Sequence, residues 1–168
     1  MRVRNIHERI ITASTEQLGA LLDTLASSND QIWPRERWPA MRFDRPLGKG
    51  AVGGHGPIRY FIANYRPGRS ILFTFTGPQG FQGQHGFEIE RVDDQHSLLR
   101  HRLEMVADGK ARFSWPLAFR PLHDALIEDA LDKAELQLGH TPTPRTWSPW
   151  VHILRRALSR RRRRTRGR

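Results

Sequence analysis

The chain contains no cysteine, which excludes disulfide bonds and thiolate metal sites. It also lacks an apolar run long enough to span a bilayer, and Met1 leads into a charged segment without the apolar stretch of a secretory signal. These absences predict a cytoplasmic protein, with peripheral attachment to a membrane as the alternative. The length of 168 residues suffices for one domain with its own core, followed by a tail.

Acidic residues are missing from the end of the chain. Residues 155–168 hold nine arginines and neither aspartate nor glutamate. Without this segment, 19 lysines and arginines stand against 17 acidic residues, although the formal net charge of the whole chain is +11. The basic character therefore belongs to the tail, and it does not indicate a nucleic-acid-binding fold.

Recognisable catalytic and cofactor motifs are missing as well. Gly48-x-Gly50-x-x-Gly53 matches the letters of a dinucleotide fingerprint, but it runs into another strand instead of opening a helix. These glycines instead predict a bulge or tight curvature in a bent sheet. No Ser-His-Asp arrangement and no His-Glu-x-x-His motif is legible, so the sequence predicts neither a cofactor nor a metal site.

The elements that are present follow a clear order. Residues 3–13 predict a strand, and Ser14 with Gln17 forms a capping box for a helix. Residues 31–47 carry two Trp-Pro pairs, and strands follow at 57–65, 70–76, 81–92 and 97–107. A single amphipathic helix is predicted over 111–138. Strands in series followed by one long helix predict an α+β fold, a curved antiparallel sheet wrapped around a C-terminal α-helix.

The last hairpin allows its register to be predicted. The apolar residues of both strands have odd residue numbers, so the numbers of two facing residues must add up to an even number. A three-residue loop at 93–95 meets this condition and sets Phe87 opposite His101 and His85 opposite Leu103. His85 and His101 then become neighbours on the inward face.

This order of elements resembles the START-like, polyketide-cyclase-type (SRPBCC) superfamily, over roughly residues 3–138. The segments that carry the resemblance are the opening strand, the helix capped by Ser14, Gly53-Gly54-His55-Gly56-Pro57-Ile58-Arg59-Tyr60, Phe73-Thr74-Phe75-Thr76, His85-Gly86-Phe87-Glu88-Ile89-Glu90, Trp115-Pro116-Leu117 and Arg120-Pro121-Leu122-His123-Asp124-Ala125-Leu126. The resemblance implies a helix-grip fold with an internal cavity that binds a hydrophobic, lipid- or polyketide-like molecule. It implies no particular reaction.

The histidines are the leading candidates for a site in that cavity. An inward imidazole must satisfy its ring nitrogens, so His85 and His101 bond to each other, to water or to backbone, contact a ligand, or act as general acid or base in a cyclase- or dehydratase-type enzyme. The full ligand-binding set predicted is His55, Tyr60, Phe75, His85, Phe87, His101, Leu103 and Trp115. Trp33 and Trp38 either cover the cavity mouth or pack the early elements onto the sheet. His123 and Asp124 are adjacent on a helix and are not predicted to form a dyad; the helix dipole accounts for Asp124.

The chain divides at residue 139 into the ligand-binding domain and a proline-containing linker with a basic tail, residues 140–168. Tryptophan beside arginine is typical of an interfacial membrane helix, so residues 147–168 predict contact with an anionic membrane. The candidate contacts with lipid or phosphate are Trp150, Arg155, Arg156, Arg161 and Arg162. Non-specific binding to nucleic acid is the second interpretation. Without a partner, residues 159–168 are expected to be a solvated, disordered tail.

Overall fold

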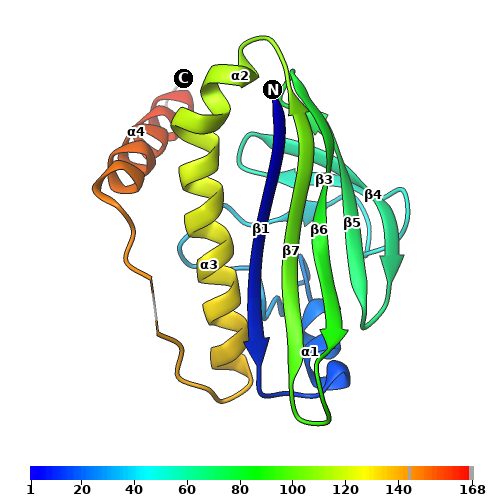
Figure 1. Ribbon diagram of the computed structural model, residues 1–168. Coiled ribbons are helices and arrows are strands. Elements are labelled where there is room, and N and C mark those ends of the chain that lie inside the picture. Colours follow the sequence, from blue (N-terminus) through cyan, green and yellow to red (C-terminus); the bar gives the residue numbers. More distant parts are fainter. Residues whose placement is uncertain (144, 167–168) are drawn as a thin grey trace.

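The computed structural model describes residues 1–143 and 145–166, and the side chains of residues 1–143 and 145–158. Within this part of the chain, one seven-stranded antiparallel sheet runs in the order β1-β7-β6-β5-β4-β3-β2. The strands are β1 (Arg2–Ile11), β2 (Arg42–Phe43), β3 (Val52–His55), β4 (Ile58–Arg66), β5 (Ser70–Gly77), β6 (Phe81–Arg91) and β7 (Ser97–Ala107). The sheet curves around a long helix laid across it (Figure 1), so the predicted helix-grip fold is confirmed.

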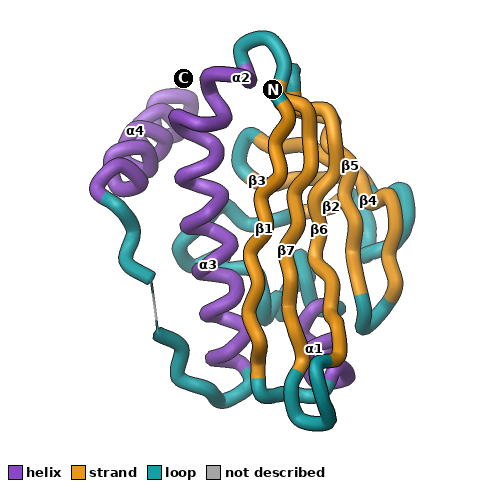
Figure 2. The backbone as a smooth tube through the Cα atoms, viewed as in Figure 1, coloured by secondary structure: helices purple, strands orange, loops and turns teal. Residues whose placement is uncertain are grey.

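The helices frame the open side of the sheet. They are α1 (Thr15–Leu22), α2 (Ala111–Ser114), α3 (Arg120–Gln137) and α4 (Pro149–Arg166). Ser14 caps α1, and both halves of its capping box with Gln17 form as predicted. After α3 the chain turns back and runs along that helix before α4 begins (Figure 2).

The hairpin between β6 and β7 has the predicted register. The Val92 amide donates to the carbonyl of His96 over 3.0 Å, which closes the three-residue loop. Phe87 pairs with His101 and His85 with Leu103. The sequence argument therefore places the correct side chains on the inward face.

The helix predicted over 111–138 is interrupted. A π-helical turn, Trp115–Phe119, lies between α2 and α3, and the Arg120 amide donates to the Trp115 carbonyl five residues back. Two prolines account for this interruption, because Pro116 and Pro121 have no N–H for the carbonyls that precede them by four residues. The carbonyl of Leu117, which Pro121 leaves without an intrahelical partner, accepts a hydrogen bond from the Trp150 indole at 2.7 Å. The interruption thus supplies an attachment point for α4.

The orientation of β1, which the sequence left open, turns a polar face toward α3. Ile6 and Ile10 are exposed, whereas Asn5, His7 and Arg9 point inward. The side chains that meet them along α3 are Asp124, Glu128, Asp132 and Glu135. Two residues of a strand advance about 6.7 Å and one turn of a helix about 5.4 Å, a difference small enough for successive strand residues to meet successive turns over this short row.

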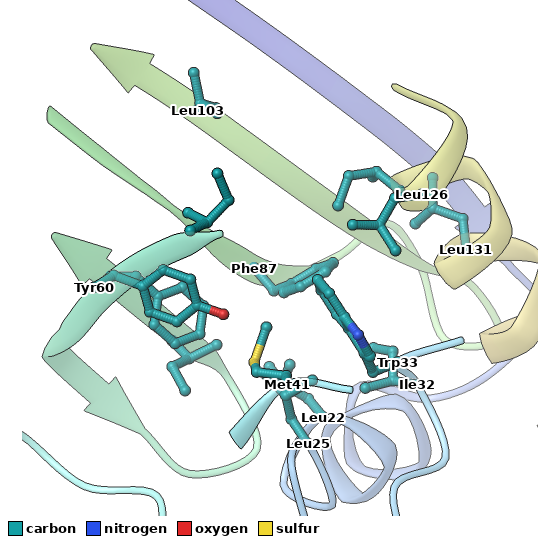
Figure 3. Close-up of a cluster of buried hydrophobic side chains, with 14 of the residues drawn as sticks. Leu22, Leu25, Ile32, Trp33, Met41, Tyr60, Phe87, Leu103, Leu126 and Leu131 are labelled. Carbon is teal, nitrogen blue, oxygen red and sulfur yellow. The ribbon is translucent and has the colours of Figure 1, made fainter. Parts of the chain in front are cut away.

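The hydrophobic core fills the space between the sheet, α1 and the lower part of α3. Figure 3 shows Leu126 and Leu131 from α3 facing Phe87 of β6, with the Trp33 ring beside Phe87. Leu22 and Leu25 close the core on the α1 side. Towards the other end of α3 the packing opens into a cavity.

Candidate functional site: a histidine-containing cavity

The cavity has a volume of about 420 Å³ and lies between the sheet, the π-helical turn, α3 and α4. Its walls are mainly aromatic and aliphatic. Four histidines, His55, His85, His101 and His123, are the titratable side chains among the described residues that line it. The site is therefore an apolar chamber with a small number of hydrogen-bonding groups, the arrangement expected of a small-molecule pocket.

The structure gathers the residues proposed from the sequence around this cavity. All of the predicted ligand-binding residues line it except Tyr60, and so do Trp33 and Trp38. Tyr60 lies behind the wall, fully buried, and its hydroxyl is 2.9 Å from Nδ1 of His55. Tyr60 therefore positions His55 and does not itself face the cavity, while the ligand-binding role of the whole set stays a prediction.

His85 and His101 form the centre of the polar wall. Nδ1 of His85 lies 3.4 Å from Nε2 of His101, a long hydrogen bond. The other ring nitrogen of each, Nε2 of His85 and Nδ1 of His101, is buried without a hydrogen-bond partner. Burial lowers the pKa of both imidazoles well below the usual value, so both rings are neutral at neutral pH. A neutral pair of this kind still has hydrogen-bonding capacity to offer a ligand.

His123 extends the row, and the sequence analysis did not select it. Its ring lies 5.0 Å from that of His101. Its Nδ1 lies 3.5 Å from the Asp124 carboxylate, too far for a good hydrogen bond, and its Nε2 is buried without a partner. Burial lowers its pKa too. The sequence did contain a signal for the position of His123. Phe119, His123 and Ile127 are spaced four residues apart, about one helical turn, and all three line the cavity.

The interpretation of Asp124 as a helix-dipole residue is wrong. Its carboxylate accepts a hydrogen bond from Asn5 at 2.8 Å and lies 3.2 Å from Nε2 of His7. Burial opposes its ionisation, but His123, His7 and Asn5 together outweigh burial and hold its pKa below the usual range. Sequence reasoning considered only neighbours along the helix, whereas the partners of Asp124 come from β1.

His7 stands between two carboxylates. Its Nδ1 lies 2.7 Å from Glu128, and its Nε2 faces Asp124. Burial lowers the pKa of His7, but these two hydrogen bonds and charges outweigh it, so the pKa is raised. His7 therefore carries a positive charge more readily than the cavity histidines beside it.

One group of side chains in the described part of the chain has the spacing of a metal site. A ligand atom from each of His7, His123 and Asp124 lies within 4.8 Å of the others. Imidazole and carboxylate suit an ion such as zinc. Both ring nitrogens of His7 already face carboxylates, however, so ion pairing accounts for the cluster without an ion.

The basic tail contributes to the cavity, which the sequence did not predict. Leu154, Ala157 and Leu158 of α4 line it. The Arg155 guanidinium stacks between two indoles, 4.4 Å from the Trp38 ring centre and 4.0 Å from that of Trp147. Because α4 shares the cavity with the preceding elements, the division at residue 139 does not separate the site from the tail.

The predicted lipid- or phosphate-contacting residues fall into two groups. Trp150 is half exposed, and Arg155 is held against the domain by its two tryptophans. Arg156 is exposed on α4. The side chains of Arg161 and Arg162 lie outside the described residues. No helix in the described chain is both long and apolar enough to cross a membrane.

Solved structures share this fold. CalU16 from Micromonospora echinospora superposes with a TM-score of 0.58 at 13% identity, covering 92% of this chain and 83% of that one. Norcoclaurine synthase from Thalictrum flavum superposes with a TM-score of 0.62 at 13% identity, covering 83% of this chain and 88% of that one. EF2215 from Enterococcus faecalis is a conserved protein of unknown function. It superposes with a TM-score of 0.57 at 16% identity, covering 95% of this chain and 84% of that one. No family model and no curated protein matches the sequence. At these identities the likeness shows a shared fold alone, the curved sheet around a long helix described above.

Proposed function

We propose that the protein binds a hydrophobic small molecule, lipid- or polyketide-like, in the cavity between the sheet and the helices. The observation that carries this proposal is an apolar chamber whose central polar groups, His85 and His101, each have a buried ring nitrogen with no partner. Buried polar groups are almost always satisfied, and a ligand atom is a natural partner for them. The volume of about 420 Å³ is in the range of small-molecule sites.

The chemistry of the wall also defines the polar part of the ligand. The imidazoles are neutral, and a carboxylate buried beside them would lack a counter-ion. In a neutral, hydrogen-bonded pair one of the two remaining nitrogens carries a proton and the other does not. A hydroxyl can therefore accept from one ring and donate to the other, and a carbonyl can accept from the protonated ring. The preferred ligand is therefore an apolar molecule with an uncharged oxygen near one end.

Native mass spectrometry of freshly purified protein tests the proposal. Ala118 lines the cavity, so Ala118→Trp is expected to fill it. Wild-type protein should retain an apolar molecule, and Ala118→Trp should not. The matched control is Val106→Trp, which places the same side chain on the outer face of the sheet, where Val106 is 42% exposed.

Solution binding of N-phenyl-1-naphthylamine, an uncharged apolar probe, gives a second readout. The probe should fluoresce with wild-type protein and with Val106→Trp, and at least about tenfold more weakly with Ala118→Trp. Equal fluorescence in all three proteins, together with no retained molecule, would show that the cavity does not bind apolar compounds.

An enzyme of the cyclase or dehydratase type is the second candidate function, and the unpartnered nitrogens of the histidine pair favour it. The fold hosts a synthase among the solved structures. From the sequence, a general acid or base here predicts a pH-rate limb near neutrality. Because burial lowers both pKa values, the limb is now expected on the acid side of 6.5. Once a retained molecule identifies a substrate, full activity in both His85→Gln and His101→Gln would exclude this mechanism.

A further inference from the structure

An exposed apolar patch lies at the end of the molecule where α2 and α4 meet. It consists of Phe113, Leu117, Trp150 and Ile153, whose exposed fractions are 71%, 62%, 47% and 54%. Phe113 and Leu117 are one helical turn apart, and the Trp150 indole reaches the Leu117 carbonyl at 2.7 Å. Side chains from two separate segments therefore share one surface, and α2 and α4 lie together at this end in Figure 1.

Basic residues predominate in the sequence around the exposed apolar patch. Residues 109–123 contain Lys110, Arg112 and Arg120 and no acidic residue, although the exposed Asp108 precedes them and Arg120 pairs with Asp124 at 3.6 Å. Lys110 and Arg112 are exposed next to Phe113. After Glu135 the chain contains no further acidic residue, and α4 leads into the arginine-rich end. A large aromatic side chain in water beside several cations is the composition of a surface that enters a lipid headgroup layer.

We propose that the exposed apolar patch and its flanking basic residues dock on the surface of an anionic lipid bilayer. The apolar side chains would enter the boundary between headgroups and acyl chains, and the arginines and lysine would contact lipid phosphates. A nucleic acid would use the same cations, but it offers no reason for Phe113 and Leu117 to be so exposed. The combination of apolar and basic groups favours the membrane.

The part of α4 that carries the patch also borders the cavity, which gives this docking a consequence. Leu154 and Ala157, which line the cavity, each come four residues after a member of the patch, Trp150 and Ile153 respectively. The helix that meets the bilayer is thus also a wall of the chamber. The docking proposal does not depend on ligand binding, because its evidence is the outer surface of α2 and α4.

Vesicle flotation with purified full-length protein tests the proposal. The probes are phosphatidylcholine vesicles with and without phosphatidylserine. The patch variant is Phe113→Ser with Leu117→Ser, whose side chains are largely exposed, so the fold should be unaffected. The control variant is Ile10→Ser with Val92→Ser, which are 58% and 50% exposed at the opposite end of the sheet.

Wild-type protein and the control variant should float with the phosphatidylserine vesicles, and the patch variant should bind at least about tenfold more weakly. Added salt should weaken binding in every case. A deletion of the tail is a poorer test, because it would also remove the cavity wall formed by α4.

Two results would overturn the proposal. One is the absence of wild-type binding to phosphatidylserine vesicles. The other is equal binding by wild-type protein and the patch variant, because the arginines alone would then make the contact. Titration of the same proteins with duplex DNA shows whether that contact is a general phosphate site.

Discussion

At the scale of single residues, the cavity histidines lower the stability of the fold but provide hydrogen-bonding groups for a ligand. His85 and His101 are 5% and 1% exposed, and each has a ring nitrogen without a partner. An unsatisfied buried polar atom costs about 1–3 kcal/mol. Side chains of this kind are typical of binding sites, where stability is traded for function.

The lowered pKa values make this cost depend on pH. When a folded-state pKa lies below the unfolded value of 6.5, the unfolded chain binds more protons as the pH falls, and the free energy of unfolding decreases. We expect wild-type protein to lose stability between pH 7.5 and 5.5, and His101→Phe to lose about 1 kcal/mol less over that range.

Urea unfolding at both pH values measures this difference. His152→Phe, which changes an exposed histidine of α4, is the control and should behave like wild-type protein. A pH dependence that is the same in His101→Phe and wild-type protein would contradict the assignment of a buried neutral imidazole. His7, whose pKa is raised, acts in the opposite direction, since its stabilising effect is present at low pH and lost as the pH rises.

The sequence predicted His85, Phe87 and His101 on the inward face. Side chains alternate between the two faces of a strand, so the length of the loop fixes the register of the hairpin. It did not predict the carboxylate partners of His7. Those contacts join β1 to α3 across more than a hundred residues, and periodicity within one element contains no information about them.

At the scale of elements, a row of ion pairs joins β1 to α3. The Arg9 guanidinium lies 3.0 Å from Glu128 and 3.1 Å from Asp132, and it also bonds to Glu135. Its side chain is only 19% exposed. Because the pattern places charge on the inward face of a strand, the rule that apolar residues face inward could not orient β1. The orientation of β1 can be explained only together with the acidic residues of α3 that its polar side chains contact.

Removal of the cation should leave these carboxylates facing one another. We expect Arg9→Met to lower the free energy of unfolding by about 2 kcal/mol, less than for a fully buried pair because some solvent reaches the site. The control is Arg102→Met, which removes an exposed pair with Glu104 and should cost about 0.5 kcal/mol or less. Chemical denaturation at neutral pH measures both, and equal effects would show that the β1–α3 row is no stronger than a surface pair.

At the scale of the whole molecule, α4 converts an open groove between the sheet and α3 into a covered chamber. Arg155 holds it in place by stacking on Trp38 and Trp147, and Asp129 accepts hydrogen bonds from both of these indoles. The sequence predicted an interfacial helix with tryptophan beside arginine. It could not show whether the apolar residues of this helix face a membrane or the protein's own cavity, because both surroundings are apolar.

Loss of the stacked guanidinium should loosen α4 without unfolding the sheet. In Arg155→Gln we expect the amides of residues 151–158 to exchange with deuterium at least about tenfold faster, with exchange in β6 and β7 unchanged. Arg145→Gln is the control, since the Arg145 side chain is 71% exposed and pairs with Glu128 of α3 instead of stacking on the tryptophans that hold α4. Unchanged exchange in α4 would show that the stacking does not secure the helix.

The order of strands has a consequence for the time course of folding. β1 is the first strand made, yet its neighbour in the sheet is β7, with Arg2 paired to Val106. The cations of β1 meet their carboxylates only after α3 exists. A nascent chain must therefore carry its opening strand unpaired until β7 has been made, well past the middle of the polypeptide. Such long-range pairing makes folding slow.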